Sequence, residues 1–325
     1  MNETTIVAFR KIHVPQAVEL LSAYYANEQR ANPVLPPWQD YFVLITKQLS
    51  VLAEKGQGFV ILERDVPIGY LAGYAVDALF GKAKGIYIPI YGHAADHSRR
   101  TEIEQVLYER AAEAWVGQDV FSHAISVFAH DTPLMDMWHQ LGFGNRCVDA
   151  IRAIRPKHSA NPEFRIERIT SQNAALVEAI HREHNRYYRS SPMFMPTQEE
   201  DAMQDLLDWL SHDDRMMFCL QYDGVTAGYV RYQAMGESVF SIHPSMRNIT
   251  GLYVLPQYRN RGIGERLLHH VESILDQHGF GILGVDYESI NPKGNRFWQT
   301  HFVPHTYTLV RRIDERINGF QHGEM

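Results

Sequence analysis

The sequence predicts an α/β protein made of two tandem copies of one domain, each a mixed sheet between layers of helices. Three observations lead to this fold class. The chain has 325 residues, whereas a usual single domain has ~100–200 residues. Similar residues recur at a nearly constant offset between the two halves. Strand patterns alternate with helix patterns in each half and some strands form hairpins, which is typical of a three-layer domain with a mixed sheet.

The internal repeat defines the expected domains. Matched pairs are Val177 with Val18, Gly228 with Gly69 and Phe302 with Phe143 at offset 159, and Trp298 with Trp138 at offset 160. The segment GLYV at 251–254 likewise matches GIYI at 85–88. We therefore expect one domain over residues 1–155, a polar linker over 156–163, a second domain over 164–315 and a C-terminal tail over 316–325.

The second copy predicts its elements in a regular order. Alternating apolar residues indicate strands, and 3.6-residue periodicity indicates helices. Ser171 and Asn173 lie near an expected helix start, Asp223 and Gly224 form a two-residue hairpin turn, and Gly279 closes a helix. The expected order is a strand at 164–170, helices at 171–188 and 197–213, a hairpin at 216–235, a strand at 246–256, a helix at 264–279, a strand at 280–291, a short helix at 291–302 and a strand at 304–313.

Composition and charge narrow the function classes. Apolar residues make up 45% and charged residues 21% of the chain, as in globular proteins with full-sized cores. The formal net charge of −7 argues against non-specific binding to nucleic acids or anionic membranes. The start lacks a signal-peptide pattern and no segment reaches 18 consecutive apolar residues, so we expect a cytoplasmic protein. Cys147 and Cys219 lack metal-ligand spacing, and we expect two buried thiols and no metal site.

A basic, glycine-containing turn precedes the helix expected at 264–279. Arg259, Gly262 and Gly264 form the pattern Arg-x-x-Gly-x-Gly. Glycines allow a close backbone approach, and the free N–H groups of a helix's first turn favour phosphate, so the turn predicts a pyrophosphate cradle with Arg259 and Arg261 as mobile charges at its rim. The alternative is a surface turn whose glycines only reverse the chain.

The segment LYVLPQYRNRGIGERLL resembles the acetyl-CoA-binding segment of the GNAT acyltransferase superfamily. In that family, loop amides bind the pyrophosphate of coenzyme A, and the end of the preceding strand pairs with the pantetheine arm. The family's Asn, followed by an aromatic pair, is matched here by Asn291 with Phe297 and Trp298. The resemblance implies acetyl-CoA as cofactor, held by Leu252, Tyr253, Val254, Arg259, Asn260, Arg261, Gly262, Ile263, Gly264, Asn291, Phe297 and Trp298.

Two departures qualify the resemblance. The family usually places Tyr, which can protonate the departing thiolate, where this chain has Trp298, whose indole N–H is too weak an acid. The usual Gly-Phe after the short helix is His301-Phe302 here. The first copy departs further, because GHAADHSRR at 92–100 has no glycine at either cradle position. We expect this degenerate copy not to bind cofactor and to support the second copy, either as a wall of the acceptor cleft or as a packing partner only.

The repeat also ranks catalytic candidates, because residues present only in the copy with the cradle are better chemical suspects. Glu288 faces Phe128 and Asp286 faces Ser126 at the matching positions. A carboxylate on this strand would take a proton from the attacking amine if burial moved its pKa toward neutrality. Glu288 is the preferred base, with Tyr287 as a candidate for the missing acid.

The acceptor site is expected in the segment between the first two helices of the second copy, as the resemblance implies. Arg186, Tyr187, Tyr188 and Phe194 are the candidate substrate residues, since aromatic groups form an apolar wall and an arginine can pair with an acidic group. The leading function is an N-acetyltransferase that acts on a primary amine of a small molecule, without nucleic-acid or membrane partners, as a monomer or homodimer. The alternatives are a non-enzymatic acyl-CoA sensor or scaffold, and an acetyltransferase acting on a protein or peptide amine.

Overall fold

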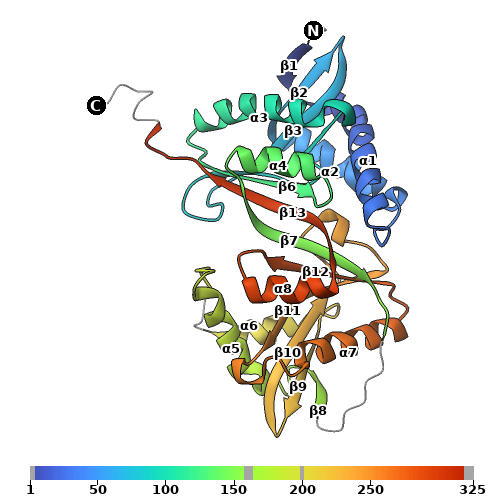
Figure 1. The fold of residues 1–325 in the computed structure, drawn as a ribbon, viewed down its shortest axis with the longest axis vertical. Coiled ribbons are helices and arrows are strands. Elements are labelled where there is room, and N and C mark those ends of the chain that lie inside the picture. Colours follow the sequence, from blue (N-terminus) through green and yellow to red (C-terminus); the bar gives the residue numbers. More distant parts are fainter. Residues whose placement is uncertain (1–3, 157–163, 198–200, 318–325) are drawn as a thin grey trace. The chain divides into compact units, whose positions relative to one another are not determined.

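The computed structural model describes residues 4–156, 164–197 and 201–317 (Figure 1). Most of the expected linker, at 157–163, and most of the expected tail, at 318–325, lie outside these residues. The described elements follow the same order in both halves of the chain: strand, two helices, a hairpin, a strand, a helix, a strand, a helix and a final strand. The α/β fold with tandem copies is therefore confirmed.

The first half carries four α-helices and two short 3-10 helices. Its sheet has the strand order β1-β2-β3-β4-β6, with β5 on β3. The elements are β1 (Thr4–Ala8), η1 (Lys11–His13), α1 (Val14–Ala31), α2 (Trp38–Lys55), β2 (Gln57–Glu63), β3 (Val66–Val76), β4 (Gly85–Ile88), β5 (His93–Ala95), η2 (His97–Arg99), α3 (Arg100–Val116), β6 (Ser122–Phe128), α4 (Thr132–Gln140) and β7 (Gly144–Ala153).

The second half repeats this layout, with the strand order β12-β11-β10-β9-β8. Strands β9 and β10 form the expected hairpin, with positive φ at Asp223 and Gly224. The elements are β8 (Phe164–Ile169), α5 (Ala175–Arg189), α6 (Ala202–Leu210), β9 (Met216–Tyr222), β10 (Val225–Gln233), η3 (Val239–Ser241), β11 (Met246–Val254), η4 (Pro256–Tyr258), α7 (Ile263–Gln277), β12 (Ile282–Glu288), α8 (Pro292–His301) and β13 (Val303–Arg312).

The last strands of the two copies are exchanged. One compact unit comprises residues 1–148 together with 304–325, and the other comprises 149–303. Strand β13 pairs antiparallel with β6, from Thr306 opposite Phe128 to Arg312 opposite Ser122. The end of β7 belongs to the other unit, where the Ile154 N–H donates to the Gly281 carbonyl at 2.9 Å. The units therefore differ from the consecutive halves that the repeat alone suggests.

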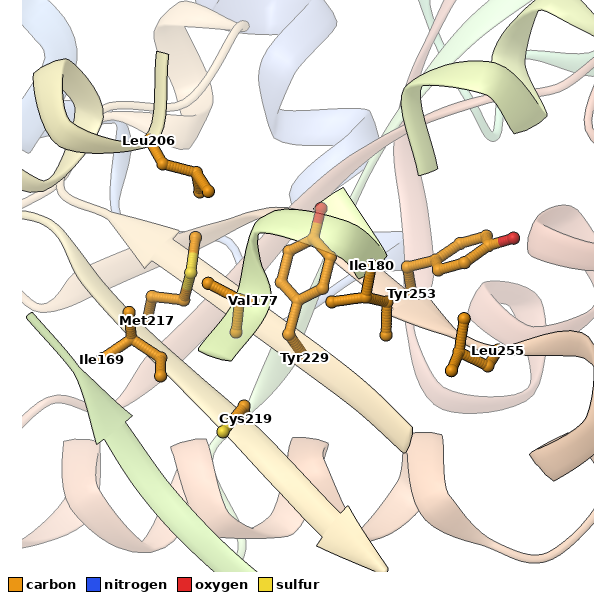
Figure 2. Close-up of a cluster of buried hydrophobic side chains, with 9 residues drawn as sticks. All are labelled: Ile169, Val177, Ile180, Leu206, Met217, Cys219, Tyr229, Tyr253 and Leu255. Carbon is orange, nitrogen blue, oxygen red and sulfur yellow. The ribbon is translucent and has the colours of Figure 1, made fainter. Parts of the chain in front are cut away.

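Helices cover both faces of the sheet in the unit 149–303. Neighbouring residues of a strand point to opposite faces, and on β10 Tyr229 packs into a buried cluster with Val177 and Ile180 of α5. A Cβ atom on the adjacent Gly228 would instead lie 3.1 Å from Ile263 of α7. Figure 2 shows the nine side chains of the cluster: Ile169, Val177, Ile180, Leu206, Met217, Cys219, Tyr229, Tyr253 and Leu255.

Several local expectations need correction. Helix α5 begins later than expected, and its N-cap is Ala174 without a side-chain cap, because the Asn173 side chain accepts from the Thr170 N–H instead. Helix α6 is shorter than 197–213 and is capped by Asp201, while residues 198–200 lie outside the described part. Cys219 is buried, but Cys147 is only partly buried near the start of β7. Among the described residues, every helix is too short or too polar to cross a membrane.

Candidate functional site

Two neighbouring parallel strands separate at the centre of the unit 149–303. Strand β11 pairs with β12 only from Met246 opposite Ile282 to Ile249 opposite Val285. On its other side, β11 stays paired with β10 as far as Val254. Residues 251–254 of β11 and 286–288 of β12 therefore face each other without ladder hydrogen bonds, and we call this opening the strand gap. Backbone N–H and C=O groups that face it are available to a ligand.

A β-bulge explains where the strands separate. The register between β10 and β11 shifts between Arg231 and Tyr232, so that Gly251 lies opposite Arg231 and Ile249 lies opposite Tyr232. Thr250 is the extra residue. A bulge bends its strand and increases the local twist, and here it lies directly after the last residue of β11 that pairs with β12.

Helix α7 begins next to the end of β11 with a glycine turn. Gly262 is the N-cap residue, has φ of +74° and provides no side-chain cap. Its left-handed conformation favours glycine, and nothing lies within 4 Å of where a Cβ would be. Gly264 is constrained differently, because a Cβ there would lie 3.2 Å from the Phe297 ring. The uncapped first-turn N–H groups form an anion-binding end of the kind that suits phosphate.

Of the two arginines of the turn, Arg259 is folded back onto the protein, whereas Arg261 is exposed. The Arg259 Nε donates to the Val254 carbonyl at 3.0 Å, and its guanidinium lies over the rings of Tyr187 and Tyr253 at 5.2 and 5.3 Å. Arg261 lies within 5.8 Å of the Tyr258 ring centre. Arg259 thus ties the end of β11 to helix α5, while Asn260 at the tip of the turn has φ of +60°.

Asn291 connects helix α8 with helix α5. It is the N-cap of α8, and its Oδ1 accepts from the Gly294 N–H at 3.1 Å. The same Oδ1 accepts from the Tyr187 hydroxyl at 2.8 Å. Tyr187, expected as a substrate residue, therefore lies beside the expected cofactor residue Asn291.

Of the aromatic pair on α8, Trp298 is buried and Phe297 is partly buried. Trp298 is 7% exposed and packs edge-on against Phe297 and Phe302. Tyr287, also buried, stacks on Trp298 with ring centres 6.4 Å apart. Tyr287 therefore points toward α8, on the opposite face of β12 from its neighbours Asp286 and Glu288.

The structure places Asp286 and Glu288 on one face of the sheet, where they both act electrostatically on the Tyr188 hydroxyl of α5. Burial, followed by the charge of Glu237, raises the pKa of Asp286 to about 7. Burial, followed by the charges of Asp286 and Glu237, also raises the pKa of Asp149 well above its ordinary value. Asp149 comes from β7, which the sequence assigns to the other copy. A carboxylate that titrates near neutral pH is suited to general base catalysis.

Two buried histidines of α5, His181 and His184, lie at the hydroxyl of Tyr229 on β10. The hydroxyl of Tyr229 is 2.7 Å from His184 Nδ1 and 3.3 Å from His181 Nδ1. Burial, followed by the charge of Arg231, lowers the pKa of His184 to about 3 and of His181 to about 4. Both imidazoles are therefore uncharged near neutral pH and add no positive charge to the site.

The four expected acceptor residues differ in burial. Tyr187 and Tyr188 are half-buried and face the site, whereas Arg186 is exposed and Phe194 is 72% exposed. Arg231 was not predicted as a site residue, although it is present only in the second copy: Ala72 occupies the matching position at offset 159. No sequence signal connected Asp149 to this site.

In the first copy the corresponding opening is filled. Strand β4 pairs with β6 only as far as Ile88 opposite Ile125. Beyond that point the buried His93 of β5 places its Nε2 2.8 Å from the Ser126 carbonyl oxygen and its Nδ1 2.8 Å from Glu104 Oε2. The buried Arg100 at the start of α3 pairs with Asp131, the counterpart of Asn291.

In the part of the chain that the structure describes, no group of three or more His, Cys, Asp or Glu side chains is arranged to hold a metal ion.

Comparisons with known proteins agree with this geometry. Residues 177–302 match the family model described as "Acetyltransferase (GNAT) family". A tandem GNAT protein from the clavulanic acid biosynthesis pathway has a similar structure, with 14% identity, a TM-score of 0.50 and coverage of 95% of this chain and 98% of that one. A GCN5-related N-acetyltransferase from Sphaerobacter thermophilus has 11% identity, a TM-score of 0.61 and coverage of 95% of both chains. No protein among the curated ones matches the sequence significantly.

Proposed function

Since residues 177–302 match the GNAT acetyltransferase family model and a tandem GNAT protein shares the fold, we propose that the second copy transfers an acetyl group from acetyl-CoA to a primary amine of a small molecule. The observation that carries this proposal is the strand gap beside the uncapped start of α7. The gap offers unpaired backbone groups to an extended pantetheine arm. The glycine turn at Gly262 offers N–H groups to a pyrophosphate.

The residues of the site divide the chemical work. Backbone N–H groups of residues 251–254 that face the strand gap stabilise the negative oxygen that develops on the thioester carbonyl. Asp286 or Glu288 accepts a proton from the attacking ammonium, which frees the nitrogen lone pair. Acetyl-CoA supplies the activated acyl group: the nitrogen bonds to the carbonyl carbon, the C–S bond breaks, and the coenzyme A thiolate leaves and takes a proton from water. Holding both reactants in one opening lowers the entropic part of the barrier.

The first copy, in this proposal, does not bind acetyl-CoA. Its opening contains the buried side chains of His93 and Glu104 in place of a ligand, and its helix α3 starts with the buried Arg100 rather than with glycine. An intact protein should therefore bind one equivalent of acetyl-CoA. Isothermal titration that gave two equivalents per chain would contradict this part of the proposal.

The glycine turn gives a direct test of cofactor binding. Gly262→Asp places a negative side chain where phosphate would lie, and we expect acetyl-CoA affinity to fall at least about tenfold, since a like-charge contact costs several kcal/mol. The matched control is Gly279→Asp at the other end of α7. Gly279 also has a positive φ, of +78°, and open space around its Cβ position, so it reproduces the backbone strain without the ligand contact. Equal acetyl-CoA affinity in the two variants would contradict the cradle.

A turnover assay distinguishes a small-molecule acetyltransferase from the alternative functions. Wild-type protein is incubated with acetyl-CoA and a panel of small amines, and release of the free thiol is followed. We expect thiol release that depends on the amine. Binding of acetyl-CoA without thiol release would indicate a sensor or scaffold, and release only with peptide amines would indicate a protein acceptor.

A further inference from the structure

A half-buried arginine without a hydrogen-bond partner lies on the face of the sheet that carries Asp286 and Glu288. Building on the proposed function, we infer that the acceptor amine also carries a carboxylate, as amino acids do, and that Arg231 binds this carboxylate. The inference rests on the position of Arg231, on its lack of a protein partner and on the charges around it.

Arg231 lies where the strands separate. It is on β10 directly opposite Gly251, at the β-bulge. Its side chain crosses over that glycine, because a Cβ on Gly251 would lie 2.9 Å from Arg231 Nε and 3.3 Å from its Cγ. The side chain shares the face of Tyr229, two residues earlier on the strand. Glycine at position 251 thus makes room for this arginine next to the strand gap.

Among the described residues, the guanidinium has no hydrogen-bond or ion-pair partner. Its Nε is buried and unpaired, and no residue in the described ranges accepts a hydrogen bond from it or forms an ion pair with it. Its contact is with the ring of Trp209 on α6, at 5.2 Å. Buried donors are normally satisfied, and a charged donor left unpaired costs stability. A planar carboxylate matches the fork of N–H groups that Arg231 presents.

The surrounding charges favour a ligand with two opposite charges. The positive charge of Arg231 acts on Asp286 and lowers its pKa against the effect of burial. His181 and His184 are neutral near pH 7, so these two side chains add no positive charge to that of Arg231. A positive group on β10 and negative groups on β12 therefore face the same space. An amino acid satisfies both, since its carboxylate meets Arg231 while its ammonium meets Asp286 or Glu288.

Arg231 is better placed for the acceptor than for the cofactor phosphates. Gly251, which lies opposite Arg231 in the sheet, is three residues before the end of β11 at Val254. Three residues of a β-strand span about 10 Å. The glycine turn lies beyond that end. Ala72 stands at the matching position of the first copy, so the same fold forms there without a guanidinium.

Matched acceptors test the inference. Initial rates of acetyl transfer are compared for amino acids and for the corresponding amino acid amides, which keep the amine and lose the negative charge. We expect wild-type protein to prefer the amino acids. Arg231→Gln should reduce kcat/KM about 10- to 150-fold for the amino acids, the value of a hydrogen bond to a charged group, and leave kcat/KM for the amides nearly unchanged. Arg231→Lys keeps the charge and should recover part of the loss.

Arg215 serves as the matched control, because it contacts the same indole ring as Arg231. The guanidinium of Arg215 also lies over Trp209, at 5.7 Å, and Arg215→Gln should leave the preference intact. Acetyl-CoA affinity of each variant reports whether the fold is intact. The inference is overturned if wild-type protein acetylates amides as well as amino acids, or if Arg231→Gln lowers both rates equally. The proposed function itself fails, independently of Arg231, if acetyl-CoA is bound and no small amine is acetylated.

Discussion

At the scale of single residues, the structure adds Asp286 as a candidate base beside Glu288, which the sequence preferred. The sequence predicted Glu288 as the base and Tyr287 as a candidate for the acid, but adjacent strand residues point to opposite faces, and Tyr287 stacks on Trp298. The structure instead brings Asp286 and Glu288 together beside Tyr188. Burial raises the pKa of Asp286 to about 7, and the proposed reaction needs a base that titrates near neutral pH.

Asp286→Asn should reduce kcat/KM about 10²- to 10⁴-fold, the usual contribution of a general base. In wild-type protein kcat/KM should fall as the pH drops below about 7, because the carboxyl then becomes protonated. The measurement is a pH profile of kcat/KM for wild type, Asp286→Asn and Glu288→Gln. If Glu288→Gln removes the acidic limb while Asp286→Asn keeps it, Glu288 is the base, as the sequence analysis preferred.

The same carboxyl should affect stability with a defined sign. Its folded-state pKa of about 7 lies above its ordinary value of 3.8, so ionisation opposes folding, and stability falls as the pH rises from about 4 to about 7. Asp286→Asn removes that ionisable group. We therefore expect the variant to have a higher thermal midpoint than wild type at pH 8, with a smaller difference at pH 5. A lower midpoint of the variant at pH 8 would contradict the assignment.

At the scale of elements, the β-bulge and helix α7 position the site. The bulge ends the pairing of β11 with β12 and sets Gly251 beneath Arg231. Helix α7 lies close to β10 because Gly228 has no side chain, and its Ile263 and Leu267 fill that space. The start of the helix, with its unpaired N–H groups, is thereby held at the end of β11.

Gly251→Ala tests the bulge. The added methyl would lie 2.9 Å from Arg231 Nε, so the flexible arginine side chain must move. We expect a loss of kcat/KM for amino acid acceptors in the same direction as for Arg231→Gln but smaller, with unchanged affinity for acetyl-CoA. The control is Gly281→Ala, where nothing lies within 4 Å of the new atom. Equal kinetics of Gly251→Ala and wild type would show that the position of Arg231 does not matter.

At the scale of the whole molecule, the two copies are joined by exchange of their last strands. Strand β13 ends the second copy in sequence, but from Pro304 onward it belongs to the unit formed with residues 1–148. Strand β13 pairs with β6, and its Leu309, opposite Ile125, is fully buried. The acidic site likewise includes Asp149, which follows the first copy's helix α4. Each unit therefore depends on chain from both halves.

Leu309→Ala should destabilise the unit that contains residues 1–148, by about 2–5 kcal/mol for a fully buried leucine. Hydrogen exchange followed by mass spectrometry should show faster exchange in β6 than in wild-type protein. Val303→Ala, at a 42% exposed position, is the control and should change little. Faster exchange in β8–β11 with unchanged exchange in β6 would contradict the strand exchange.

The sequence by itself determined the tandem fold, the order of the elements and the glycine turn, because these depend on local periodicity, turn chemistry and an internal repeat. The boundaries of α5 and α6 were predicted less accurately. Several neighbouring polar residues could each cap a helix, and the sequence does not show which one does, as Asp201 does for α6. Only the tertiary structure decided which side chains share a face and which strand completes which sheet. It separated Tyr287 from Glu288, folded Arg259 back onto Val254, and brought Arg231, Asp286 and Asp149 to one region. Those relations depend on the bulge register and on pairing between distant strands, which local sequence patterns do not encode.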